Sequence, residues 1–194
     1  MRILALLLSP GWLATLVAVA AIVVVEWSVG GVLVGFAGAL VGVMAILAAS
    51  QVGLLASVPL VGVRVQRVVI GIGPRLADWS RPNRTLVIRA IPVILAVNVR
   101  ATRAPVRKRM WWSALCSAVA EIAVLVAAAL GAADGGPFAH GFAIACVAEF
   151  THALLPRRTA SGTSTGWLLF KLPWVSTDQA RQLEAAPLVG EAIE

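Results

Sequence analysis

Long apolar stretches separated by short polar segments make up most of this chain. Between Leu4 and Val63 there is no Lys or Arg, and Glu26 is the only acidic residue. From Met110 to Pro156 there is again no Lys or Arg. Such stretches exceed the ~20 residues that a helix needs to cross ~30 Å of hydrocarbon. The pattern predicts about four transmembrane helices, over residues 11–27, 32–60, 110–130 and 138–155.

Residues 62–99 have a different pattern. Val63–Ile70 and Thr85–Ile91 are rich in β-branched residues, which is typical of strands. We therefore expect a small β-hairpin, cytoplasmic or dipping into the membrane, between the second and third helices. Residues 93–99 are expected to form a third strand or a short membrane-dipping segment.

Short polar segments should connect these elements. We expect a turn at residues 28–31, a basic linker at 100–109 and a cytoplasmic tail at 157–194. Within the tail, Ser176 and Gln179 match a capping box ahead of a short helix. The expected fold is an α-helical integral membrane protein forming a single membrane domain over residues 1–194.

Composition and charge support a membrane protein and give its orientation. Hydrophobic residues make up 60% of the 194 residues and charged residues 13%, against about 25% in soluble domains. The net charge of +7 does not indicate a nucleic-acid partner, because the basic residues lie beside the apolar stretches, as in cytoplasmic loops. Eleven of the 16 basic residues lie between the second and third helices: Arg64, Arg67, Arg75, Arg81, Arg84, Arg89, Arg100, Arg103, Arg107, Lys108 and Arg109. Four more follow the fourth helix and one precedes the first, so both termini are expected in the cytoplasm.

The order of these elements carries a resemblance to a known family. The segment LVGVRVQRVVIGIGP spans residues 60–74, IRAIP spans 88–92, and LLP closes the fourth helix at 154–156. Over roughly Val32 to Leu172 the chain resembles the site-2 protease family of intramembrane zinc metalloproteases. In that family two histidines of an HExxH helix and a distant Asp hold zinc, and the Glu activates water.

The positions that the resemblance assigns to this chemistry carry other residues. The HExxH window falls on residues 50–54, with Ser50 and Leu54 at the histidines and Gln51 at the Glu. Ala153 falls at the Asn of the family's NLLP motif, and Thr165 at its zinc-binding Asp. The resemblance therefore implies a degenerate member that is no enzyme and holds neither metal nor cofactor.

Three ionisable residues remain inside the apolar stretches. Glu121 lies in the third helix, and Glu149 and His152 share one face of the fourth. Burying such groups costs several kcal/mol, so they are candidates for a substitute metal site, a proton relay or a ligand pocket. Structural pairing of Glu149 with His152, or hydrogen bonding of Ser50 and Gln51 with Glu121, is the alternative.

These observations predict a catalytically inactive protein of the plasma or bacterial inner membrane that binds a transmembrane peptide or a membrane-protein partner, such as an active protease. In the family an edge strand docks extended substrates by β-augmentation, which requires no zinc. The corresponding strand carries Thr85, Val87, Arg89 and Ile91. Two alternatives are an active peptidase of altered mechanism and a small transporter or channel-like subunit.

Overall fold

The computed structural model describes five segments of the chain: residues 10–26, 28–81, 84–101, 105–159 and 162–176. Contacts divide the chain into two compact units. Unit 1 comprises Met1–Leu47 and Glu121–His152, and unit 2 comprises Ala48–Ala120 and Ala153–Glu194. Each unit therefore combines segments that are far apart in the sequence.

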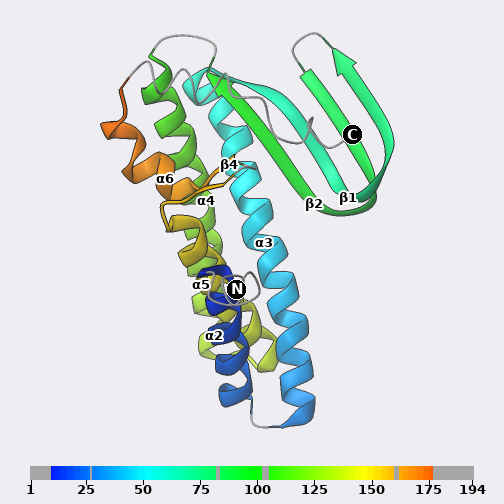
Figure 1. Ribbon diagram of the computed structural model, residues 1–194. Helices are drawn as coiled ribbons and strands as arrows, with labels where there is room; N and C mark the ends of the chain where they lie inside the picture. The colour runs from blue at the N-terminus through cyan, green and yellow to red at the C-terminus, as the bar shows by residue number, and fades with distance from the viewer. Residues whose placement is uncertain (1–9, 27, 82–83, 102–104, 160–161, 177–194) are drawn as a thin grey trace, which may run out of the picture. The chain divides into compact units, whose positions relative to one another are not determined.

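The described part of the chain is mostly helical, and helices cover the four stretches where they were predicted. These helices are α2 (Pro10–Val25), α3 (Val29–Val61), α4 (Val106–Ala133) and α5 (Pro137–Leu154) (Figure 1). By length and composition, α3 and α4 are long and apolar enough to cross a membrane. Both helices contribute residues to both units.

Two helix boundaries differ from the prediction. The expected turn at 28–31 is wrong from Val29 onward, because α3 begins there and Ser28 Oγ accepts a hydrogen bond from the Gly31 N–H at 3.0 Å. Helix α4 begins at Val106, so residues 107–109 lie in its first turn rather than in a linker. Arg and Lys are good helix formers, and the preceding Pro105 needs no helical N–H partner.

In unit 1, α3 and α5 approach each other through glycines. A methyl group added at Gly38 would overlap the carbonyl oxygen of Phe138, and one added at Gly141 would overlap that of Gly35. At Gly42 an added Cβ would lie 2.6 Å from the carbonyl oxygen of Phe142. Small residues allow this approach where larger side chains would hold the two backbones apart.

A polar contact and an apolar cluster complete unit 1. The Nδ1 atom of His140 on α5 lies 2.6 Å from Oε1 of Glu26, which directly follows α2. The apolar cluster is built on the buried side chains of Ile46, Ala128 and Cys146, from α3, α4 and α5 respectively. Unit 1 is therefore held by contacts among all four long helices.

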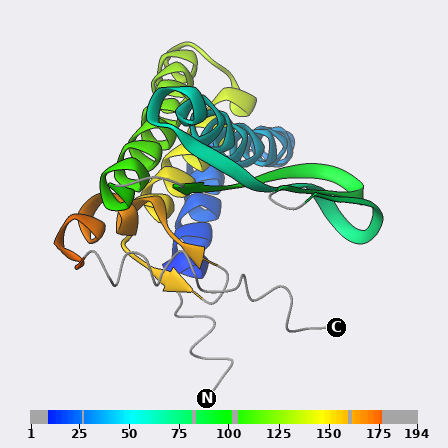
Figure 2. The same ribbon diagram turned by 90° about the horizontal axis from the view of Figure 1, so that it is seen from above.

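In unit 2, strands β1 (Val63–Arg81) and β2 (Arg84–Ala101) form the predicted hairpin (Figure 2). Each residue of 67–70 in β1 has two partners in β2, one within 95–98 and one within 85–88. Gly71 follows at φ +93°, where a side chain would meet the carbonyl oxygen of Ile91 at 2.5 Å, so glycine permits this close approach. Residues 93–99 belong to β2 and are a strand.

Two apolar clusters and a short helix complete unit 2. One cluster is built on four side chains of the hairpin, against which α3 and α4 pack: Val63, Val97, Val99 and Ala101. The second is built on Trp167 of α6 (Thr165–Phe170) and Leu172 of the 3-10 helix η1 (Leu172–Trp174). The short strands β3 (Arg158–Thr159) and β4 (Gly162–Thr163) pair before α6. Neither α6 nor these strands were predicted, and the predicted helix after Ser176 lies outside the described residues.

Candidate functional site

The candidate site is the part of α3 where the resemblance places the zinc-binding window. Ser50 and Leu54 are four residues apart and so share one face of the helix, while Gln51 lies beside them. All three belong to unit 2, together with the start of α4 and the hairpin. Their contacts within this unit indicate what each side chain does.

Ser50 is bound to α4. Its Oγ lies 2.7 Å from Oγ of Ser117, and the Ser117 hydroxyl also lies 3.1 Å from the Ser50 carbonyl oxygen, to which it can donate. Gly53 allows this approach, because a Cβ there would lie 2.5 Å from the carbonyl oxygen of Cys116. Ser117 is 2% exposed and Ser50 is partly buried, so the Ser117 side of this hydroxyl pair is shielded from solvent. Hydroxyl pairs of this kind stabilise helix contacts in apolar surroundings.

Gln51 is bound to the hairpin. The backbone N–H of Val97 in β2 donates to Gln51 Oε1 at 2.7 Å. Residues 95–101 of β2 pair only with the first part of β1, so their other side is an edge whose N–H groups need acceptors. Gln51 supplies one such acceptor. A glutamine can do this but cannot serve as a general base, because its amide does not take up a proton near neutral pH.

Leu54 is part of an apolar cluster. It packs against the buried group of Val63, Val97, Val99 and Ala101 together with Val58 and Val61 of the same helix. Its carbonyl oxygen accepts a hydrogen bond from the buried Ser57 hydroxyl at 2.6 Å. The face that would hold a second zinc-binding histidine therefore contributes to the hydrophobic core of unit 2.

The remaining two positions lie around a turn between α5 and α6. Ala153 is near the end of α5, and Thr165 is the first residue of α6. Between them Ser164 Oγ accepts from the N–H groups of Arg157 at 3.0 Å and Trp167 at 3.1 Å, and donates to the carbonyl of Leu155 at 2.7 Å. Ser164 is thus the N-cap of α6 and holds the turn closed.

The structure brings two of the three predicted ionisable residues together. His152 Nδ1 lies 3.9 Å from Glu149 Oε2, and each side chain is about one third exposed, at 36% and 35%. Glu121 is buried, at 2% exposure. Among the described residues, no group of three or more His, Cys, Asp or Glu side chains could hold a metal ion. Glu121 is therefore not part of such a group with Glu149 and His152.

The predicted peptide-binding strand is not an edge over most of its length, which corrects the expectation from sequence. Thr85 pairs with both Arg67 and Ser80, and Val87, which is fully buried, pairs with both Val69 and Asp78. The other two residues have one partner each: Arg89 pairs with Arg75, and Ile91 with Ile72. In the segment 75–81 of β1, each residue that pairs with β2 has only one pairing partner there, so this segment forms an edge of the sheet.

The family resemblance pointed to Ser50, Gln51 and Leu54, but it gave no indication of the residues that hold them. Ser117 lies 67 residues from Ser50, and Val97 lies 46 residues from Gln51. A buried serine in an apolar helix is the only sequence signal for Ser117, and Val97 takes part through its backbone, which leaves no signal. The chain matches no protein-family model, and no curated protein matches it significantly.

Proposed function

We propose that this chain is an integral membrane protein with four transmembrane helices and cytoplasmic termini. The length and apolar composition of α3 and α4 support the membrane placement. The position of the basic residues supports the orientation, because each lies before α2, after α5, or in the stretch 64–109 that runs from the hairpin to the first turn of α4. The described hairpin, rich in arginine, then lies on the cytoplasmic side.

Within the membrane, the chain acts as a catalytically inactive relative of site-2 proteases that binds a membrane peptide or protein. One observation carries this proposal: the positions of the HExxH window are engaged inside the chain. Ser50 contacts α4, Gln51 contacts β2, and Leu54 packs in the core of unit 2. Side chains that make such contacts stabilise the fold of unit 2 and leave no open coordination position for a metal-bound water.

The pairing of the hairpin indicates where an extended partner binds. Residues 75–81 form the outer segment of β1, with Leu76 at 68% exposure and Trp79 at 57%. An edge of this kind offers backbone hydrogen bonds to an added strand, and its exposed side chains offer apolar contacts. The segment 75–81 replaces Thr85–Ile91 as the proposed docking edge.

A photo-crosslinking amino acid at Leu76 tests the docking edge. In native membranes it should give an adduct with another polypeptide, which mass spectrometry identifies. Phe170 on α6 is a matched control, because it is also an exposed apolar side chain of unit 2, at 55%. Equal adduct yields at both positions, or none at Leu76, would contradict the docking edge.

Metal analysis of the purified chain tests the inactive state. The proposal expects no stoichiometric zinc, both as purified and after dialysis against zinc and removal of the excess. One bound zinc per chain would contradict it. Ser50→His combined with Leu54→His restores two imidazoles one helical turn apart, so a gain of zinc in this variant supports the placement of the window.

A further inference from the structure

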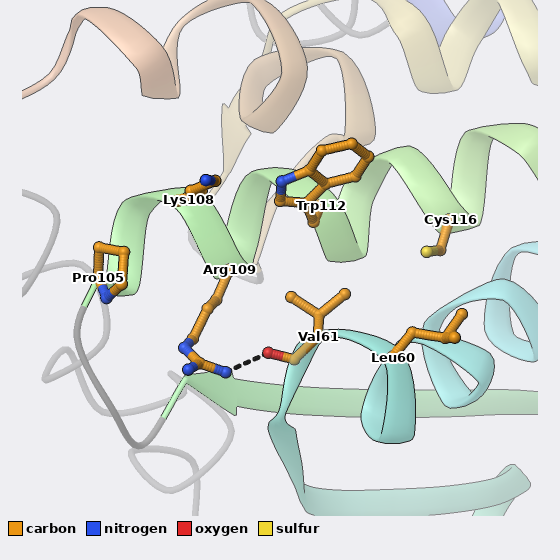
Figure 3. A pocket seen from close by; sticks show the side chains of 7 residues that line it. All are labelled: Leu60, Val61, Pro105, Lys108, Arg109, Trp112 and Cys116. Carbon is orange, nitrogen blue, oxygen red and sulfur yellow. Dashed lines mark hydrogen bonds between the residues drawn. The ribbon is translucent and has the colours of Figure 1, made fainter.

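A pocket in unit 2 combines cationic and apolar side chains. Its volume is about 600 Å³, within the ~300–1,000 Å³ typical of small-molecule sites. It is lined by the last residues of α3 and by the start of α4 (Figure 3): Leu60, Val61, Pro105, Lys108, Arg109, Trp112 and Cys116. The spacing 109, 112 and 116 follows one face of α4, which explains why these residues meet the same space.

The two cations of the pocket differ in their contacts. Arg109 reaches from α4 to the end of α3, where its Nη1 donates to the carbonyl oxygen of Val61 (Figure 3). The same nitrogen lies 3.3 Å from the carbonyl oxygen of Gly62, to which it also donates. It thereby satisfies carbonyl groups that the helix end leaves without partners. Lys108 is exposed and has no hydrogen bond or ion pair in the described part of the chain. Its ammonium group is therefore available to a ligand.

No acidic side chain among the described residues of unit 2 lines this pocket. Among the described residues of unit 2, Asp78 on the hairpin is the only acidic one, and it accepts a hydrogen bond from Ser80 at 3.1 Å. Two of the apolar lining side chains are accessible: Leu60 on α3 is exposed at 75%, and Trp112, on α4 beside the two cations, at 43%. The ligand that fits has a negatively charged head and a hydrophobic tail.

We propose that this pocket binds an anionic membrane phospholipid. Its phosphate lies near Lys108 and Arg109, and an acyl chain covers Leu60 and Trp112. Basic pockets between membrane helices on the cytoplasmic side suit anionic headgroups, and tryptophan favours the same interfacial depth. The proposal rests on the membrane placement of α3 and α4, but it is independent of the peptide-binding role.

Fluorescence quenching by brominated lipids tests the site. The purified chain in zwitterionic nanodiscs is titrated with phosphatidylglycerol or phosphatidylcholine, each brominated on its acyl chain, and the Trp112→Phe variant identifies the signal of Trp112. Trp112 should be quenched preferentially by the anionic lipid. Lys108→Gln should weaken this preference about fivefold, the factor expected for one Lys near the surface. Lys171→Gln is the matched control, because Lys171 is an exposed lysine of the same unit outside the pocket, and it should leave the preference unchanged.

Each other outcome overturns the site. Equal quenching by both lipids, or an equal loss in Lys108→Gln and Lys171→Gln, would mean that surface charge alone attracts the lipid. Reversal of quenching by glycerol phosphate would identify a site for a free phosphate compound. Release of the chain from membranes by alkaline carbonate would contradict the membrane placement, and with it both the proposed function and the lipid site. A chain that stays in the membrane without lipid preference overturns the lipid site alone.

Discussion

Gly42→Ala should destabilise the chain through the contact between α3 and α5. The added Cβ would lie 2.6 Å from the carbonyl oxygen of Phe142 and 3.1 Å from its Cα. An ordinary contact begins at 3.4 Å, so the two backbones must separate by 0.8 Å (3.4 − 2.6). The Gly42 carbonyl also accepts a weak hydrogen bond from Cys146 Sγ at 3.6 Å, which the same movement would lengthen.

The expected loss follows from two opposing effects. Inserting a methyl group into a close-packed contact costs about 1–3 kcal/mol. Replacing glycine by alanine inside a helix returns up to about 1 kcal/mol. The free energy of unfolding should therefore fall by up to about 2 kcal/mol relative to wild type, and by about 1–3 kcal/mol relative to a helix glycine-to-alanine change without the overlap; it is measured by steric trapping in detergent micelles or by titration with SDS followed by circular dichroism.

Gly30→Ala is the matched control on the same helix. An added Cβ at Gly30 has nothing within 4 Å, and the same is true of Gly131 on α4. Both control variants should be as stable as the wild type or slightly more so, because only the helix preference of alanine acts. If Gly42→Ala is as stable as Gly30→Ala, the close approach of α3 and α5 is refuted.

Three further predictions concern the polar contacts. In a double-mutant cycle, Ser50→Ala and Ser117→Ala should show a coupling free energy of about 0.6 kcal/mol, with ~1.7 kcal/mol as an upper bound. Stability losses that simply add in the double mutant would contradict the hydroxyl pair. Gln51→Leu should leave a strand N–H without its acceptor, at a cost of about 1–3 kcal/mol, and hydrogen exchange at that amide should speed up, whereas Gln51→Glu should preserve protection. His140→Phe should lower the free energy of unfolding by about 1 kcal/mol, a modest value because the imidazole is one third exposed. The loss should disappear when the change is made in a Glu26→Gln background. Equal losses in both backgrounds would rule out the contact.

The sequence was sufficient for the helices and the hairpin because each leaves a local pattern. Apolar stretches without basic residues located α2 to α5 to within a few residues. The β-branched runs located the beginnings of β1 and β2, but both strands continue about ten residues beyond the predicted ends. The start of α4 was missed because residues 107–109 are charged, and charge was taken as a sign of a linker. The short helix α6 was missed because its six residues are too few for a periodic pattern.

Strand pairing could not be predicted in the same way. Residues 85–88 are mostly β-branched, a composition that suits an edge strand and an interior strand alike, so it does not distinguish the two. The outcome depends on Gly71, which has a positive φ, and on two sets of partners in β1: residues 77–80 on one side, and the more distant residues 67–70 on the other. The proposed docking edge moved from Thr85–Ile91 to residues 75–81 for this reason.

The double pairing of residues 67–70 has a consequence for the synthesis of the chain. Their first partners, residues 85–88, leave the ribosome before their second partners, residues 95–98. At ~5–20 residues per second, the second side of this strand stays open for roughly one second longer than the first. A nascent chain therefore passes through a state in which a β-branched strand has one open edge. During that interval, protection of the nascent hairpin against pairing with other chains depends on the arginines along it, since charged side chains discourage edge-to-edge association.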